Sequence, residues 1–432
     1  MKYTLKLMAL LFMFSCGSAE SEPQAEASSD NNDNESKTTV VVEAESFVDS
    51  SGEFEVVTDD SGAKAVKITG DGAWLAYEVD VMAAGRYKVD LKASNQGDQE
   101  AILWVEDYYK NEDGRTYNIT SDVPLASSDD KGKYAVVFKE GSPLNEGKHE
   151  MKVHLKSGDV LLDNVTFSMM RAHQLTPKTM TQSDKTEGDN WVLVWSDEFD
   201  EGTQPDTSKW TYDIGNWGWG NNEPQYYTEN RTENARIEDG SLIIEARKDD
   251  MGQPWTSARL TTRGKVSFLY GKIEFRAKVP VADGTWAAGW FLGDAYRDEI
   301  SWPYCGEIDV LECVGKEIDD ETGNGINHAS CHTRAYYFKQ GNHISETIPV
   351  EKMNTEYHSY TIEWKPDGIK AFLDGEHYYT YDKVKDDLEW PFKYPQNLIV
   401  NLAMGGGMGG AINPEIDRQQ FILDYIRVYE LQ

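Results

Sequence analysis

Short runs in which apolar and polar residues alternate recur along the chain from about residue 39 to its end. Three of them are Arg86–Leu91, Ser241–Ala246 and Ser359–Trp364. Successive side chains of a β-strand point to opposite faces, so an alternation of period two predicts strands with one buried face. From residue 191 onward no long stretch follows the helical period. The pattern therefore predicts an all-β protein.

Polar stretches without periodicity divide these runs into two groups. Residues 172–190 contain Pro177 and predict an interdomain linker. We therefore expect a β-sandwich over residues 39–171 and a larger two-sheet jelly roll over residues 191–432, with its concave sheet forming a cleft. A length of 432 residues is consistent with two such domains.

The first 38 residues differ from the rest of the chain. Lys2 and Lys6 precede the apolar run Leu7–Phe14, which is too short to span a bilayer, so residues 1–16 predict an export signal. Cys16 after a small residue resembles a bacterial lipoprotein cleavage site, which implies a lipid anchor at the outer membrane or cell surface; ordinary secretion is the alternative. Residues 17–38 are rich in Ser, Asn, Asp and Glu and predict a disordered acidic tether.

The chain is strongly acidic, with a formal net charge of −33 at pH 7. A general nucleic-acid binder needs a basic face, so the charge argues against that class, and like-charge repulsion weighs against a sulfated polysaccharide as substrate. A neutral glucan fits better. Eleven of the 13 Trp residues lie from Trp191 onward, and aromatic rings stack well on the flat C–H faces of sugars. The sequence leaves the oligomeric state open, with a monomer as the default expectation.

Three carboxylates occur together in the apolar run Gly306–Glu312. Glu307 and Asp309 are two residues apart and share a face of a strand, whereas Glu312 would point to the other face. One bulged residue between Asp309 and Glu312 restores the parity, and bulges are common beside active sites. With that bulge, all three carboxylates project into one cleft.

Such a trio suits retaining glycoside hydrolysis, which uses two carboxyl groups about 5–5.5 Å apart. One attacks the anomeric carbon, while the other protonates the leaving oxygen and then activates water. Crowding pushes the pKa values of neighbouring carboxyls apart, so one is ionised while the other is protonated. The alternative is a solvated edge strand, but such a strand has no reason to flank its acids with Ile308, Val310 and Leu311.

At this motif the sequence resembles glycoside hydrolase family 16, whose bulged signature is Glu-x-Asp-x-x-Glu. The resemblance extends from about Trp191 to the C-terminus and points to the laminarinase branch. The matching stretches are Gly218–Glu223 with Gln225–Tyr227, Thr256–Leu260, Tyr270–Glu274, Gly284–Trp286, Trp302-Pro303 and Asp424–Tyr429. The resemblance implies an exported endo-acting enzyme that cleaves internal β-1,3-glucosidic bonds with retention. Mixed-linkage glucan, agar or carrageenan are alternative substrates, and a non-catalytic glucan-binding protein is the alternative of another class.

The resemblance also assigns roles to residues. Glu307 would be the nucleophile, Glu312 the acid/base, and Asp309 an aid to the nucleophile. The expected substrate-binding residues are His332, Trp286, Trp290, Asn222, Glu223, Arg259 and Asn401. A core role for the two Trp residues and a hydrogen-bonded surface role for His332 are the alternatives. In the Gly405–Gly410 loop Met408 stands where the family usually has Trp, which implies an altered positive side of the cleft.

A structural calcium ion is implied by the same family. Its ligands would be Glu198, the backbone of Gly240 and Asp424, because carboxylate and carbonyl oxygens suit Ca²⁺. Surface acids without an ion are the alternative. No cofactor is expected for catalysis. Cys305, Cys313 and Cys331 lack the spacing of a zinc site, and their pairing stays open.

The stretch over residues 39–171 resembles a family 6 carbohydrate-binding module. The matching segments are Glu43–Glu45, Gly72–Tyr77, Ala84–Tyr87 and Leu162–Val165. Leu161 stands where that family often has a sugar-binding Asn, and Tyr134 stands in place of its usual loop Trp. The domain could therefore bind sugar elsewhere on its surface or act only as a spacer.

Overall fold

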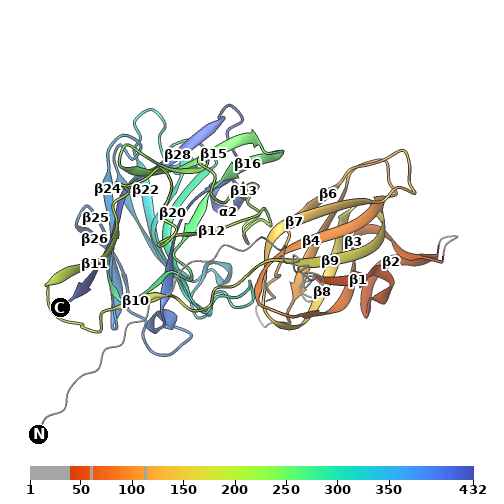
Figure 1. Cartoon of the computed structure of the whole chain (residues 1–432), viewed down its shortest axis with the longest axis horizontal. Helices are drawn as coiled ribbons and strands as arrows, with labels where there is room; N and C mark the ends of the chain where they lie inside the picture. Colours follow the sequence, from red (N-terminus) through yellow and green to blue (C-terminus); the bar gives the residue numbers. More distant parts are fainter. Residues whose placement is uncertain (1–38, 59–61, 111–113) are drawn as a thin grey trace, which may run out of the picture. The chain divides into compact units, whose positions relative to one another are not determined.

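The computed structural model describes residues 39–58, 62–110 and 114–432, so the predicted export signal and tether lie outside the described residues. Nearly all of its elements are β-strands, which form two groups along the chain (Figure 1). The helical segments are single turns: η1 (Ala44–Ser46), η2 (Gly315–Glu317), η3 (Phe338–Gln340), η4 (Pro391–Lys393) and α2 (Gly406–Gly409). The predicted all-β fold is confirmed. No helix in the described part has the length and apolar character that crossing a bilayer would require.

The N-terminal β-domain comprises the first group of strands, from Thr39 to Ala172. Its strands pair in the order β6-β5-β8-β3-β9-β4-β7, with β1 beside β9 and β2 beside β3. The strands are β1 (Thr39–Glu43), β2 (Asp49–Thr58), β3 (Lys64–Val81), β4 (Gly85–Asn95), β5 (Ala101–Tyr108), β6 (Val123–Leu125), β7 (Ala135–Leu144), β8 (Gly147–Ser157) and β9 (Asp159–Ala172). The alternate apolar residues of these strands form one buried core, to which β4 contributes Val89 and Leu91.

The C-terminal sandwich consists of two sheets. One has the order β10-β18-β27-β20-β21-β22-β23, with β12 on β17 and β17 on β27. Its strands are β10 (Thr179–Gln182), β12 (Thr211–Asp213), β17 (Arg259–Thr261), β18 (Val266–Leu269), β20 (Thr285–Gly293), β21 (Glu307–Val314), β22 (Gly325–His332), β23 (Ile344–Val350) and β27 (Gln396–Met404). This sheet carries the candidate site.

The second sheet packs behind it. Its order is β13-β16-β15-β28-β19-β24-β25-β26, with β11 on β28 and β14 on β15. Its strands are β11 (Trp191–Asp197), β13 (Gln225–Tyr227), β14 (Ala235–Glu238), β15 (Ser241–Asp250), β16 (Gln253–Ser257), β19 (Gly271–Lys278), β24 (His358–Lys365), β25 (Gly368–Leu373), β26 (Glu376–Tyr381) and β28 (Arg418–Leu431). Strand β10 lies within the segment that was predicted to be a linker. It was not predicted as a strand because four residues are too few to show an alternation.

Aromatic side chains fill the space between the two sheets. Phe291 of β20 meets Phe275 of β19 with ring centroids 6.3 Å apart and an interplanar angle of 73°, a favourable edge-to-face arrangement. A Cβ atom at Gly289 would lie 2.9 Å from the Phe275 ring. Glycine therefore lets β20 approach the opposite sheet, while Trp286 and Trp290 on the same strand face away from the core. Cys305, Cys313 and Cys331 are buried and do not form disulfides.

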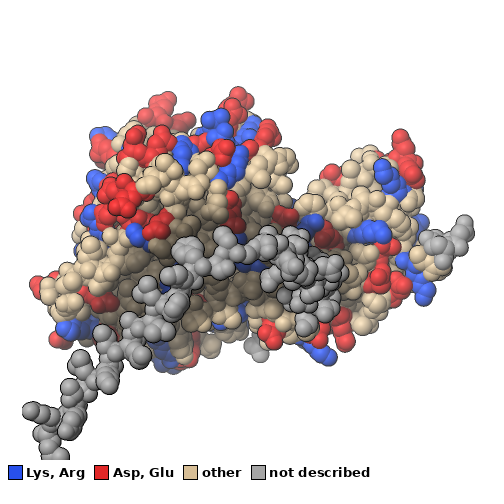
Figure 2. Space-filling model, in the orientation of Figure 1, with Lys and Arg blue, Asp and Glu red and all other residues tan. Residues whose placement is uncertain are grey.

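The surface of the described residues reflects the acidic composition. Acidic side chains are spread over the face in view, with basic side chains among them (Figure 2). Among the described residues several acidic and basic side chains form ion pairs, such as Arg427 with Glu198 at 2.7 Å. Charges mixed in this way partly compensate one another at short range.

Candidate functional site

The three predicted carboxylates lie on β21, and the expected bulge is present. Gly289 of β20 pairs with Leu311, but the next residue, Trp290, pairs with Asp309, so Val310 is left without an opposite residue. The extra residue restores the parity of Glu312, and Glu307, Asp309 and Glu312 all line one cleft. Val310 itself is buried in the core, which explains why the bulged position is apolar.

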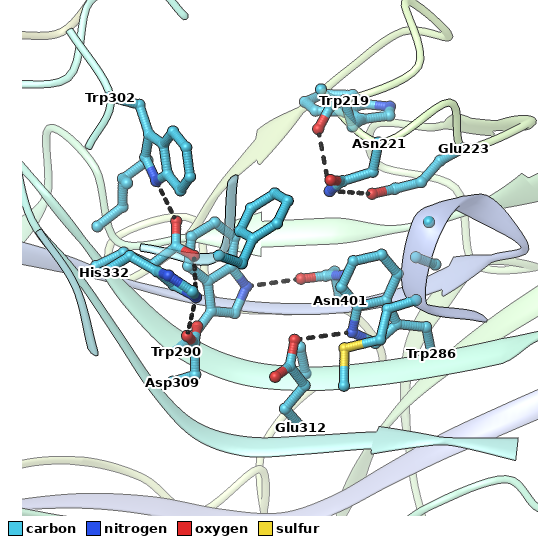
Figure 3. A pocket seen from close by; sticks show the side chains of 18 of the residues that line it. Trp219, Asn221, Glu223, Trp286, Trp290, Trp302, Asp309, Glu312, His332 and Asn401 are labelled. Carbon is cyan, nitrogen blue, oxygen red and sulfur yellow. Dashed lines mark hydrogen bonds and ion pairs between the residues drawn. The ribbon is translucent and has the colours of Figure 1, made fainter. Parts of the chain in front are cut away.

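The cleft has a volume of about 460 Å³ and lies over the sheet that contains β20, β21 and β27. On β20 the alternate residues Trp286, Ala288, Trp290 and Leu292 face the cleft. Figure 3 shows the indole rings of Trp286 and Trp290 beside the carboxylates. Aromatic faces next to carboxylates are suited to hold a sugar ring at the point of bond cleavage.

Glu307 is held by donors on both sides. The Trp302 indole donates to Glu307 Oε2 at 2.9 Å, and His332 Nε2 lies 3.9 Å from Glu307 Oε1 and 3.4 Å from Asp309 Oδ2. The Ser330 hydroxyl donates to Asp309 Oδ2 at 2.6 Å. These contacts fix the carboxylate in position and stabilise its negative charge.

Glu312 has a different environment. The Trp286 indole donates to Glu312 Oε1 at 3.1 Å. The backbone N–H of Glu312 donates to Asn327 Oδ1 at 3.0 Å, and Asn327 in turn donates to the carbonyl of Val310 at 3.0 Å. Asn327 therefore satisfies backbone groups that the bulge removes from the strand ladder.

The surroundings separate the protonation of the two glutamates. Burial raises the pKa of both Glu307 and Glu312, and the charge of Asp309 raises both further. His332 lowers the pKa of both glutamates. Trp302 and Arg259 also lower the pKa of Glu307, whereas Trp286 lowers that of Glu312 and an ionised Glu307 raises it. Because the two carboxyls titrate as a coupled pair, the charge on the first to ionise keeps the other protonated over a range of pH. The charge of Arg259, which lowers the pKa of Glu307, favours Glu307 as the first to ionise.

Neighbouring carboxylates favour the protonated form of His332. Burial favours its neutral form, but the hydrogen bond and charge of Asp309, together with the charges of Glu307 and Glu312, raise the pKa of His332 to about 9. Glu307, Asp309 and His332 place ligand-type atoms within 4.8 Å of one another. A protonated imidazole has no lone pair for a metal, so this cluster suits proton chemistry.

The floor of the cleft is a hydrogen-bonded network. The Trp290 indole donates to Asn401 Oδ1 at 2.8 Å, and Asn401 Nδ2 donates to the Tyr227 hydroxyl at 3.1 Å. The Arg259 guanidinium lies 4.8 Å from the Trp290 ring centroid and donates to Asp213 Oδ2 at 3.0 Å. The structure thus brings Trp290, Arg259 and Asn401, three of the expected substrate-binding residues, together at one place.

Glu223 also lines the cleft, but Asn222 does not. Asn221 donates to Glu223 Oε1 at 3.2 Å, and Gln225 donates to Oε2 at 2.7 Å. Burial raises the pKa of Glu223 to about 7 against the effect of these two donors. The exposed Asn222 accepts a hydrogen bond from Ser121 instead. Asn222 has a left-handed backbone (φ 58°), and the neighbouring Asn221 lines the cleft in its place.

Several lining residues were not predicted as site residues. They are Arg86, Trp217, Trp219, Asn221, Glu299, Trp302, Ser330 and His343. Two of the matching stretches in the sequence contain some of them: Trp302-Pro303, and Gly218–Glu223 with Trp219 and Asn221. Arg86 gave no such signal, because it belongs to the N-terminal β-domain.

The three predicted calcium ligands do not form a ready ion site. The Arg427 guanidinium donates to both Glu198 oxygens, at 3.0 and 2.7 Å. Arg276 pairs with Asp424. Glu198 lines a second, acidic pocket with Asp200 and Asp206, and Asp424 is not among the described residues that line it. As they stand, both carboxylates are engaged by arginines, so the residues do not fit a calcium ion without rearrangement.

The C-terminal sandwich is similar to known proteins. The family model described as glycosyl hydrolases family 16 matches residues 222–427. A β-glucanase of Rhodothermus marinus is 44% identical over 262 residues, which cover 58% of this chain and 90% of that protein. Glucan endo-1,3-β-glucosidase A1 of Niallia circulans is 34% identical over 278 residues, or 56% of this chain and 38% of that protein. The crystal structure of the Rhodothermus marinus laminarinase superimposes with a TM-score of 0.53 at 45% identity, covering 56% of this chain and 98% of that one.

Proposed function

Because this chain belongs to glycosyl hydrolases family 16 and is a glycoside hydrolase, we propose that it cleaves internal β-1,3-glucosidic bonds of laminarin-type glucans with retention. The main support for the proposal is the bulge at Val310, because it directs the side chains of Glu307 and Glu312 into the same cleft. The two side chains have different hydrogen-bond partners there. The names of the relatives, a laminarinase and two glucanases, favour a β-1,3-glucan.

In the proposed mechanism Glu307 attacks the anomeric carbon as a carboxylate. Glu312 gives its proton to the leaving glycosidic oxygen, so that the C1–O bond breaks as the bond from Glu307 to C1 forms. Water then attacks C1 of the glycosyl-enzyme, and Glu312 takes its proton as the bond to Glu307 breaks. His332 and Ser330 keep Asp309 in place beside Glu307, and Trp302 stabilises the carboxylate that leaves in the second step.

The two Trp residues of β20 serve different purposes in this mechanism. Trp290 forms the floor together with Asn401 and Arg259, which suits stacking against a retained sugar ring. Trp286 contacts Glu312, so it orients the acid as well as forming the wall beside it.

A reducing-sugar assay with product sizing tests the proposal. The substrates are laminarin, barley mixed-linkage glucan, agarose and carrageenan, and the comparison is wild type against Glu307→Gln. We expect the highest activity on laminarin, with short oligomers as products and complete loss in the variant. NMR of the first product should show the β-anomer. Activity on agarose or carrageenan alone would contradict the substrate, and a first product with the α-anomer would contradict retention.

We also propose that the chain is exported and anchored through a lipid on Cys16. The support is the charged and apolar pattern of residues 1–16. The test is incorporation of labelled palmitate by cells that express the full chain, compared with Cys16→Ser. Label in wild type alone supports the anchor, whereas a labelled Cys16→Ser variant or an unlabelled wild type contradicts it.

A structural calcium ion at Glu198, Gly240 and Asp424 is a further part of the proposal, and it rests on the family resemblance. Because arginines engage both carboxylates, binding would require the ion to displace Arg427 and Arg276. Thermal unfolding with calcium or with EDTA tests this. A rise in Tm with calcium that Glu198→Gln abolishes supports the site, and an equal Tm in both buffers refutes it.

A further inference from the structure

Arg86 of the N-terminal β-domain lines the cleft of the C-terminal sandwich. Residues 38–432 form one compact unit, and Arg86 on β4 is only 7% exposed. Its Nη2 donates to Asp213 Oδ1 at 3.2 Å, and its Nη1 donates to the carbonyl of Gly141 at 3.4 Å. These bonds use two of the five N–H groups of a guanidinium. The side chain is therefore held in place and still has donors to offer to the cleft.

The position of Arg86 is tied to the floor of the cleft. Asp213 accepts from both Arg86 and Arg259, and Arg259 lies over Trp290. The Arg86 guanidinium also lies 5.5 Å from the Trp219 ring centroid. One carboxylate thus links a residue of the N-terminal β-domain to the residues on which a sugar ring would rest.

The two chain segments beside Arg86 approach each other closely. The backbone N–H of Asn216 donates to the carbonyl of Glu140 at 2.9 Å, and the Tyr226 hydroxyl donates to Glu140 Oε2 at 2.7 Å. A Cβ atom at Gly141 would lie 2.0 Å from the carbonyl oxygen of Ile214. The close approach of these segments therefore requires glycine at residue 141. Gly141 lies on β7, which pairs with β4, so the approach holds the strand of Arg86 beside the cleft.

Further contacts extend from Glu307 towards Arg86. The Trp302 indole donates to Glu307. Arg115 in turn donates to the backbone carbonyls of Trp302 and Glu299. The Tyr296 hydroxyl donates to Glu299 at 2.9 Å, and the Tyr296 ring centroid lies 5.8 Å from the Arg86 guanidinium. These contacts connect Arg86 to Glu307, the residue that holds the retained sugar in the proposed mechanism.

We propose that the N-terminal β-domain completes the glucan cleft and that Arg86 donates hydrogen bonds to the hydroxyls of a distant sugar unit on the retained side. The domain would then act as part of the substrate site, in addition to any separate role in sugar binding. This inference rests on the proposed β-1,3-glucanase function. It predicts that the contribution of Arg86 depends on substrate length, because only a long enough oligosaccharide reaches from Glu307 to Arg86.

The test is kcat/KM for β-1,3-gluco-oligosaccharides of increasing length, measured for the full chain. Arg86→Met should lower kcat/KM on the shortest substrate that is cleaved and on the longest substrates to different extents. We expect the loss on the longest substrates to be about tenfold greater, which is the effect of removing one hydrogen bond from a charged donor. The matched control is Lys88→Met on the same strand, where Lys88 pairs with Asp90 at 2.8 Å. An equal loss at every length would overturn the inference.

A second pair of variants addresses the possibility that Arg86→Met merely disturbs the fold. Gly141 (φ 89°) and Gly72 (φ 85°) have similar left-handed backbones, but a Cβ atom at Gly72 meets nothing within 4 Å. Gly141→Ala should reproduce the length-dependent loss by displacing the Arg86 strand, and Gly72→Ala should not. If wild type cleaves none of the oligosaccharides, the proposed function itself fails. If wild type cleaves them and Gly141→Ala and Gly72→Ala behave alike at every length, only the inference fails.

Discussion

Replacing Trp302 by Phe should move the acidic limb of the pH–rate profile to higher pH. The substitution keeps an aromatic ring but removes the N–H that donates to Glu307 Oε2 at 2.9 Å. This hydrogen bond lowers the pKa of Glu307, so its loss makes the carboxylate harder to form. Because the proposed nucleophile must be ionised to attack, activity should then begin to fall at a higher pH than in wild type.

The size of the shift follows from the strength of the bond. A hydrogen bond to a charged group contributes about 1.5–3 kcal/mol, and one pKa unit corresponds to about 1.4 kcal/mol. The acidic limb should therefore move upward by about one to two pH units. The matched variant is Trp286→Phe, which removes the donor that lowers the pKa of Glu312. Its effect should fall on the basic limb, which should also move upward because Glu312 keeps its proton to higher pH.

The assay is kcat/KM on laminarin from about pH 4 to pH 10 for wild type and both variants, since this parameter reports the ionisations of the free enzyme. The two glutamates titrate as a coupled pair, so each variant should also move the other limb, but by less. A larger shift of the basic limb than of the acidic limb in Trp302→Phe, together with the reverse in Trp286→Phe, would refute the assignment of roles to Glu307 and Glu312. Unchanged profiles would show that neither indole N–H stabilises a carboxylate.

Three further predictions concern the floor, the core and the electrostatics of the C-terminal sandwich. Trp290→Ala should raise KM for laminarin more than it lowers kcat, because the ring stacks on sugar without reacting; an unchanged KM in steady-state kinetics would refute this role. Gly289→Ala should destabilise the fold by about 1–3 kcal/mol in urea unfolding, because the new methyl group would meet the Phe275 ring at 2.9 Å. Arg86 and Arg259 outweigh burial and lower the pKa of Asp213 to about 2. The ionised Asp213 therefore contributes about 2 kcal/mol to the free energy of unfolding. This contribution is present above pH 3.8 and is lost as the pH falls towards 2. The difference in unfolding free energy between wild type and Asp213→Asn should shrink over that range, and a constant difference would contradict it.

The sequence by itself determined the features that depend on local periodicity. The alternation in stretches such as Lys272–Ala277 is a property of each strand, so it predicted the all-β fold without knowledge of the partner strands. The parity of Glu307, Asp309 and Glu312 also depends only on strand geometry. For all three side chains to share a face, the strand needs one extra residue between Asp309 and Glu312. In the pairing of β20 with β21 that residue is Val310. The family resemblance then supplied roles that periodicity could not.

Only the tertiary structure decided which distant side chains complete the site. Trp302, five residues before Glu307, reaches it through a turn that no alternation describes. Asn221 faces the cleft in place of Asn222 because of a left-handed backbone at residue 222. Arg86 reaches the cleft from another domain, 127 positions before its partner Asp213. The physical reason is the same in each case: strand periodicity acts between neighbours, whereas loop geometry and domain contacts depend on groups that the sequence separates and the fold brings together.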